Sequence, residues 1–311
     1  MARQKHSRPA PSLSAQGESA TSVQIRIHGE ANQPTLIYLP GLHGDWTLVA
    51  SFRAEATRFA RFVECTYPQT TQWSLEDYAV AVTRTLLAQG IDRGWLLAES
   101  FGSQVAWALL ACPSAPSQPT CRGRTFGLPG DEAVQSLKVD GLILAGGFVR
   151  HPWPMGVRCL EWLLEHMPDY GVRVGLWLYL AYARIRHRQA PETWAGLHEF
   201  VQRRRQPQDR RAVAHRLRLI RQSDPRPVAE ATRLPVYALW GWIDPLVPNL
   251  WVARWLARSC PGYRGCRGIW WADHNVLATE PREAAVQIQQ WLMQAQSLPR
   301  QHDHAASKAS A

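Results

Sequence analysis

The segment from Leu96 to Gly102 constrains the fold of this chain more than any other. A short apolar run ends at Ser100, and a helical pattern begins directly after it. Ala98 stands two positions before the serine, and Gly102 stands two positions after it. A sharp strand-to-helix turn needs small residues at these places, because larger side chains would collide there. The segment therefore predicts a strained turn that lifts the Ser100 hydroxyl to the top of a sheet.

Apolar stretches bounded by turn residues alternate with helical patterns along most of the chain. The apolar stretches predict strands at 23–28, 35–39, 62–66, 95–98, 139–145, 236–240 and 267–271. The helical patterns predict helices at 75–89, 102–111, 249–258 and 281–296. This alternation is typical of an α/β protein with a mostly parallel central sheet and helices on both faces.

The alternation stops between residues 151 and 232. Helical patterns follow one another there, at 157–165, 172–186, 193–203 and 210–222. We interpret this block as a helical cap inserted into an α/β core of residues 21–150 and 233–297. Such a cap would lie over the carboxyl edge of the sheet, where ligands bind in folds of this class. Residues 113–132 are interpreted as an inserted loop, and the polar ends, 1–20 and 298–311, are expected to be disordered tails.

An acid and a histidine follow two of the later predicted strands. Asp244 comes a few residues after the strand at 236–240, and His274 follows the strand at 267–271. Taken singly, Asp244 could merely begin a turn before Pro245, and His274 could be an ordinary polar loop residue. Together with Ser100 they stand in the order of the α/β-hydrolases. The chain resembles that superfamily, and 244–248 is similar to its acid loop, although an alanine replaces the usual first glycine of the elbow.

The resemblance implies an α/β-hydrolase fold and a serine hydrolase mechanism. Ser100 would be the nucleophile, His274 its base, and Asp244 the group that orients the histidine. The expected substrate is a carboxylic ester with a small hydrophobic acyl part, cleaved through an acyl-enzyme without any metal or organic cofactor. A thioesterase, or a hydrolase of esters linked to an acyl carrier protein, is an alternative, as is a non-catalytic binding protein. A serine at the elbow argues against epoxide hydrolases and haloalkane dehalogenases, which usually carry aspartate there.

The mechanism also needs two backbone N–H groups that stabilise an oxyanion. One is expected from Phe101, at the start of the helix after the elbow. In the loop after 35–39, Pro40-Gly41 is similar to the family's motif at this place, and that match makes Leu42 the second donor. The following His43-Gly44 is also similar to the motif and would instead make Asp45 the donor. Gly41 would let the backbone approach the substrate without a Cβ atom.

Three further side chains are weighed as parts of the substrate site. His43 either lines the acyl pocket or hydrogen-bonds within its own loop, and the loop role is favoured. Trp177 is a candidate for an apolar acyl pocket, although aromatic residues at helical spacing are more often core. Glu99, beside the nucleophile, is expected to face away and to pack or pair at the base of the elbow.

Positive charge is concentrated in one segment. The chain has a net charge of +10, and the stretch from Arg203 to Arg221 contributes eight arginines and one acid. The simplest interpretation is a solvated helix face. The alternative is a docking surface for an acidic partner such as an acyl carrier protein, formed by Arg203, Arg204, Arg205, Arg210, Arg211 and Arg218. Nucleic acid is not expected as a partner, because no binding motif accompanies the charge.

Location is inferred from what the sequence lacks. No apolar run reaches the ~18 residues of a membrane span, and residues 1–20 have no apolar segment of the secretory kind. The six cysteines have no metal-ligand spacing and are expected to be free thiols. These features favour a cytoplasmic protein, although a peripheral membrane contact by the basic, aromatic segment stays open.

Overall fold

A computed structural model describes residues 22–111, 136–187 and 190–297. The predicted tails, at 1–20 and 298–311, and the predicted loop at 113–132 lie outside these residues. Among the described residues, no helix combines the length and the apolar character that crossing a membrane requires.

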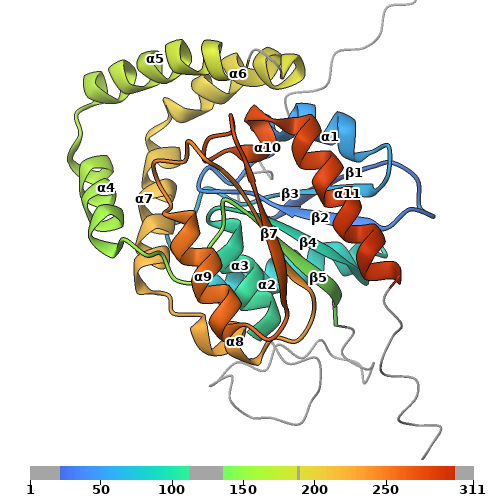
Figure 1. Cartoon of the computed structure of the whole chain (residues 1–311). Coiled ribbons are helices and arrows are strands. Elements are labelled where there is room, and N and C mark those ends of the chain that lie inside the picture. The colour runs from blue at the N-terminus through green and yellow to red at the C-terminus, as the bar shows by residue number, and fades with distance from the viewer. Residues whose placement is uncertain (1–21, 112–135, 188–189, 298–311) are drawn as a thin grey trace, which may run out of the picture.

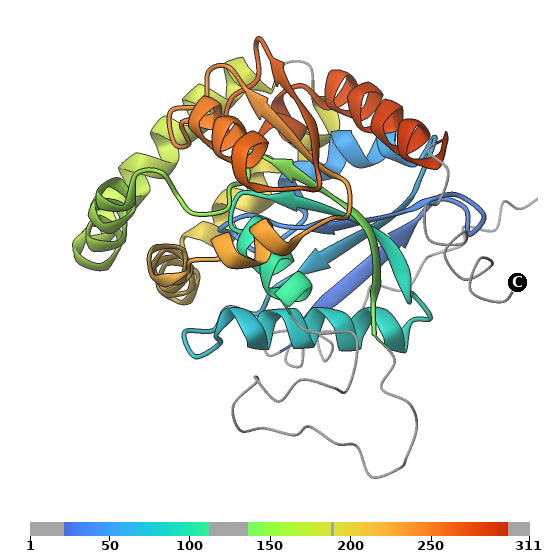
Figure 2. The ribbon, with the colours of Figure 1, turned by 60° about the horizontal axis from the view of Figure 1, so that its bottom comes forward.

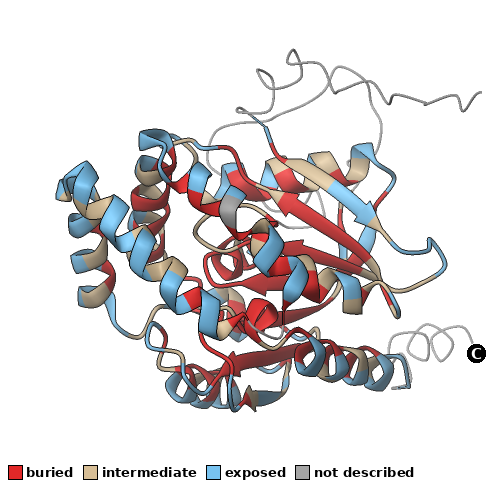
Figure 3. Cartoon of the chain, turned by 90° about the horizontal axis from the view of Figure 1, so that it is seen from above, coloured by how far each residue is buried: buried red, intermediate tan, exposed pale blue. Residues whose placement is uncertain are grey.

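The centre of the molecule is a seven-stranded sheet in the order β1-β3-β2-β4-β5-β6-β7 (Figure 1). Only β1 runs antiparallel to its neighbour, β3, and the other neighbours are parallel. The strands are β1 (Gln24–His28), β2 (Thr35–Leu39), β3 (Arg61–Thr66), β4 (Arg93–Glu99), β5 (Lys138–Ala145), β6 (Val236–Gly241) and β7 (Tyr263–Ile269). Continuous apolar runs occupy the central strands because both faces are covered, and Figure 3 shows these strands buried. The predicted mostly parallel sheet is confirmed.

Helices cover both faces of the sheet, as predicted (Figure 2). Side chains of α2 (Leu75–Ala88), α3 (Gly102–Ala111) and α9 (Asn249–Ser259) belong to one apolar core. Side chains of α1 (Ala50–Ala56) and α11 (Pro281–Ser297) belong to the core on the opposite face. Helix α2 begins at a reciprocal capping box, in which Ser74 accepts from the Asp77 N–H and Asp77 accepts from the Ser74 N–H.

Among the described residues, five helices stand between β5 and β6, and the last of them is the short α8 (Arg226–Ala231). The other four are longer. They are α4 (Pro154–His166), α5 (Asp169–Arg186), α6 (Pro191–Arg204) and α7 (Pro207–Gln222). All four begin two or three residues earlier than the apolar spacing indicates. In α4, α6 and α7 a proline occupies the first turn, a position to which proline is well suited. Their side chains contact the loops that follow β2 and β7, at the carboxyl end of the sheet. The division of the chain into core and cap stays a prediction.

The last strand lies earlier than the apolar pattern indicates. The sequence predicts a strand at 267–271, but β7 ends at Ile269, and Trp270 and Trp271 lie exposed after it. Strand β7 is at the edge of the sheet and pairs only with β6, so its position depends on that pairing. Three short helices also went unpredicted, namely α1, α8 (Arg226–Ala231) and α10 (Val276–Thr279).

Candidate active site

Ser100 lies in the turn between β4 and α3. Its backbone φ of +50° is the only positive value at a non-glycine residue among the described residues, which is the strained geometry of a sharp elbow. Gly102 allows the turn to close, because a Cβ atom there would lie 2.2 Å from the carbonyl oxygen of Leu39. The Ser100 N–H donates to Ala145 of β5, so the turn is held at the edge of the sheet.

The three residues singled out in the sequence form one chain of hydrogen bonds. The distance from Ser100 Oγ to His274 Nε2 is 2.9 Å. The distance from His274 Nδ1 to Asp244 Oδ2 is also 2.9 Å. The loops that carry these residues follow β4, β6 and β7, whose carboxyl ends meet at the same edge of the sheet.

The carboxylate of Asp244 is fully occupied by donors. Oδ1 accepts from the backbone N–H groups of Leu246 and Val247 at 2.8 and 3.1 Å. Oδ2 accepts from Asn249 Nδ2 at 2.9 Å, besides its contact with His274. Burial by itself raises the pKa of Asp244, but these donors outweigh it and hold the pKa below its usual value.

The hydrogen bond to Asp244 also shifts the pKa of His274. Burial by itself lowers its pKa, but the hydrogen bond and the negative charge of Asp244 outweigh burial and raise the pKa above 6.5. A histidine that is hydrogen-bonded through one nitrogen to a carboxylate and through the other to a hydroxyl is oriented to accept the proton of that hydroxyl.

The loop after β2 lies directly against the serine. A Cβ atom on Gly41 would be 3.4 Å from Ser100 Cβ, whereas the space beside Gly44 is filled by the guanidinium of Arg216. Neither the N–H of Leu42 nor that of Phe101 donates to any group among the described residues. Gly41 itself therefore lies against the serine and Gly44 does not, so Leu42, which follows Gly41, stays the predicted oxyanion donor.

A cavity of about 330 Å³ opens at Ser100 and His274. Much of its wall is apolar and comes from the helices of residues 154–222 and from nearby loops: Leu48, Leu164, Val172, Leu176, Val213 and Leu246. Gly41, Leu42 and His43 also line it. His43 lines the cavity and has no hydrogen bond at Nδ1 among the described residues, so a position in the acyl pocket is the alternative that the structure favours.

Trp177 does not line this cavity. Its side chain is 66% exposed, while Leu176 and Tyr179 on the same helix face inward. Successive residues of a helix point about 100° apart, so an aromatic stripe does not reveal which member is buried. The structure therefore places Tyr179, and not the predicted Trp177, in the wall of the cavity.

Glu99 occupies the wall of the cavity beside the nucleophile, rather than facing away. Its carboxyl group accepts a hydrogen bond from the hydroxyl of Tyr38, which confirms the expected pairing. Burial raises the pKa of Glu99. The site therefore holds a buried acid that the hydrogen-bond chain of Ser100 does not use.

Two arginines of the basic segment are structural. Arg204 is only 3% exposed and forms ion pairs with Asp45 and Asp209, so its placement on a docking surface is wrong. Arg216 is fully buried and donates to the backbone oxygens of Leu42 and Pro68. Alternating charge and apolar residues in the sequence do not distinguish a buried arginine from an exposed one.

Most of the other arginines on this segment are paired with acids. Arg203 pairs with Glu199, Arg210 with Asp169, and Arg218 with both Glu161 and Glu165. Among the described residues, only Arg205 and Arg211 of the six proposed docking residues have no ion pair. The surface available to an acidic partner is thus smaller than the sequence indicates.

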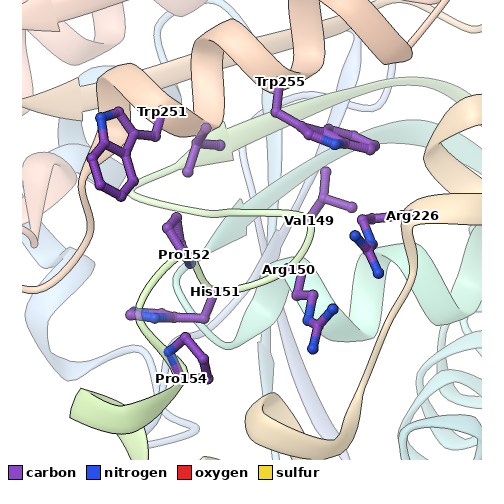
Figure 4. Close-up of a pocket in the computed structure, with 9 residues that line it drawn as sticks. Val149, Arg150, His151, Pro152, Pro154, Arg226, Trp251 and Trp255 are labelled. Atoms are coloured by element: carbon purple, nitrogen blue, oxygen red, sulfur yellow. The ribbon is translucent and has the colours of Figure 1, made fainter.

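A second cavity, of about 390 Å³, lies apart from these residues (Figure 4). It is lined by Trp251 and Trp255 of α9, by Arg226 of α8, and by residues 149–152 and Pro154. Neither Ser100 nor His274 reaches it. Among the residues that the structure describes, no cluster of histidine, cysteine, aspartate or glutamate could hold a metal ion.

Comparison with known proteins identifies the fold. No protein-family model and no curated protein matches this sequence. An enol-lactonase from Burkholderia xenovorans superposes with a TM-score of 0.62 at 16% identity, covering 89% of this chain and 96% of its own. A thermophilic esterase from Thermogutta terrifontis gives 0.64 at 16% identity, covering 88% and 93%. A putative non-heme bromoperoxidase from Mycobacterium tuberculosis gives 0.59 at 13% identity, covering 89% and 97%.

Proposed function

We propose that this chain, which has the α/β-hydrolase fold, is a serine hydrolase that cleaves a carboxylic ester through an acyl-enzyme intermediate. The observation that carries the proposal is the continuous chain from Ser100 through His274 to Asp244, with 2.9 Å at each link. A solved structure of the same fold that is named as an esterase supports the reaction class.

In the first step Ser100 Oγ attacks the ester carbonyl carbon while His274 Nε2 takes the hydroxyl proton. Asp244 keeps the proton of His274 on Nδ1 and stabilises the imidazolium. The N–H groups of Phe101 and Leu42 bind the oxyanion, each worth about 3 kcal/mol in the transition state. His274 then protonates the leaving alcohol, and water attacks the acyl-enzyme with the same proton transfers.

The substrate expected here has a small, largely hydrophobic acyl part. The apolar wall of the 330 Å³ cavity supports this. A thioester would use the same residues, and no contact among the described residues favours it. Docking of an acyl carrier protein and a cytoplasmic location stay predictions from the sequence. A non-catalytic role is disfavoured, because a binding protein has no need of a strained serine bonded to a histidine.

Labelling with a fluorophosphonate probe tests the proposal. We expect the folded wild-type protein to be labelled, Ser100→Ala to lose labelling and ester hydrolysis, and Ser223→Ala to retain both. Ser223 follows α7 and has no side-chain hydrogen bond among the described residues, so it controls for the loss of a hydroxyl. Labelling of folded Ser100→Ala, or none of folded wild type, would reject the assignment.

A further inference from the structure

Three residues that line the active-site cavity each have a buried polar atom with no hydrogen-bond partner among the described residues. These atoms are His43 Nδ1, the hydroxyl oxygen of Tyr179 and Arg204 Nε. All three residues line the same cavity as Ser100. A buried donor or acceptor without a partner destabilises a folded protein, so three such atoms at one cavity call for a ligand that satisfies them.

The three groups form one cluster around the ring of Phe200. The His43 ring stands edge-on to it with centroids 4.9 Å apart, and the Tyr179 ring is 5.7 Å away. The guanidinium carbon of Arg204 lies 4.5 Å from the Phe200 centroid. The loop after β2, α5 and α6 each contribute one group, so the cluster forms only when these elements pack together.

The charges around the cluster balance. Arg204 is paired with two carboxylates, Asp45 and Asp209, and the charge of Arg216 also acts on Asp209. Burial, followed by the charge of Arg204, lowers the pKa of His43 to about 3, so its ring is neutral. The cluster therefore offers hydrogen bonds without a net positive charge. Arg210, the other arginine that lines the cavity, is paired with Asp169, so an additional buried carboxylate would have no cation of its own.

We propose that His43, Tyr179 and Arg204 bind an uncharged oxygen on the acyl chain of the substrate, a hydroxyl or carbonyl group remote from the scissile ester. The inference rests on the proposed function and narrows it to esters of oxygenated acids. The Tyr179 hydroxyl and the Arg204 Nε–H donate to this oxygen, and His43 Nδ1 accepts from a hydroxyl or donates to a carbonyl.

A series of 4-nitrophenyl hexanoates tests the proposal by kinetics. It comprises the plain ester, esters with one oxo or hydroxyl group at each successive chain position, and the mono-ester of the six-carbon dicarboxylic acid. We expect one or two of the oxygenated positions to give a KM about tenfold below that of the plain ester, as one added neutral hydrogen bond allows. The dicarboxylic mono-ester is expected to bind no better than the plain ester.

Tyr179→Phe is the diagnostic variant and Tyr67→Phe its matched control. Each removes one buried hydroxyl that has no partner, but Tyr67 does not line the cavity. Both should melt at or above the wild-type temperature, because neither loses a hydrogen bond. Only Tyr179→Phe should abolish the tenfold preference for the oxygenated ester, whereas Tyr67→Phe should keep both this preference and the wild-type KM for the plain ester.

Calorimetric titration of Ser100→Ala with the same esters measures binding apart from catalysis. Tighter binding of an oxygenated ester that Tyr179→Phe abolishes supports the site, even if the wild-type protein hydrolyses no ester and the proposed function fails. Equal binding of plain and oxygenated esters overturns the inference, whether or not plain esters are hydrolysed. Tighter binding of the dicarboxylic mono-ester alone also overturns it, because the site would then recognise an anion.

Discussion

Arg216 Nη1 donates to the backbone oxygen of Leu42 at 2.6 Å, and this bond ties helix α7 to the loop that lies against Ser100. The Leu42 oxygen accepts from no other donor among the described residues. The guanidinium also donates to Pro68 and to the hydroxyl of Tyr78, so one buried cation connects three separate segments of the core. The conformation of the proposed oxyanion loop therefore depends on a residue 174 positions away.

Arg216→Met should lower both stability and turnover. The unpaired Leu42 oxygen costs about 1–3 kcal/mol of unfolding free energy. The loosened loop should lower kcat more than it raises KM, because the oxyanion forms only in the transition state. Urea unfolding and ester kinetics measure these effects. Arg211→Met is the control: Arg211 is exposed on the same helix, and its loss should change stability by less than about 0.5 kcal/mol. Equal kcat in both variants would contradict the positioning role.

Asp244→Asn should reduce kcat by about 10⁴-fold while the protein stays folded. The carboxylate accepts on both oxygens, from two backbone N–H groups on Oδ1 and from His274 and Asn249 on Oδ2. Whichever oxygen the asparagine NH₂ group replaces, it would face hydrogen-bond donors. Either His274 then loses the acceptor that orients it, or the backbone N–H groups on Oδ1 lose theirs. Steady-state kinetics with a circular dichroism spectrum checks this, and a loss of under tenfold in folded protein would argue against Asp244 as the orienting acid.

The pH profile should show an acid limb with its midpoint above 6.5. His274 must be neutral to take the Ser100 proton, and Asp244 raises the pKa of His274. Protonation below this pKa removes the base, so kcat/KM should rise with pH and level off above the midpoint. In Asp244→Asn the residual activity should have its midpoint at lower pH, since burial then acts on the histidine without the compensating charge. An unshifted midpoint would mean that another group governs the limb.

Gly102→Ala and Gly175→Ala should change stability in opposite directions. A Cβ atom on Gly102 would lie 2.2 Å from the Leu39 oxygen, so the elbow must shift, at about 1–3 kcal/mol. Gly175 lies within α5 and has nothing within 4 Å of its Cβ position. Alanine there should stabilise the helix by about 0.5–1 kcal/mol. Thermal unfolding of both variants decides between them, and a Gly102→Ala protein as stable as wild type would mean that the elbow tolerates a side chain.

The fold and the hydrogen-bond chain at Ser100 could be predicted because their signals are local. An apolar strand, small residues two positions before and two positions after Ser100, and a helix behind it specify a turn within seven residues. In a parallel sheet the carboxyl ends of all strands meet at one edge, so acids and histidines that follow strands converge without any knowledge of packing. Asp244 and His274 could be predicted for that reason.

The tertiary structure alone decided which side chains of residues 151–232 face the site. Tyr179 faces the cavity and Trp177 faces solvent. Arg204 and Arg216 are buried, although the sequence of their segment indicates an exposed basic face. Helical spacing defines a face but not its partner, and an arginine is buried only where distant carboxylates or carbonyl oxygens meet it. Those partners, Asp45 and Leu42, come from a loop more than 150 positions away. The sequence therefore predicts the residues of the hydrogen-bond chain, because short local segments specify them. It does not predict which side chains line the cavity, because that depends on how elements far apart in the sequence pack.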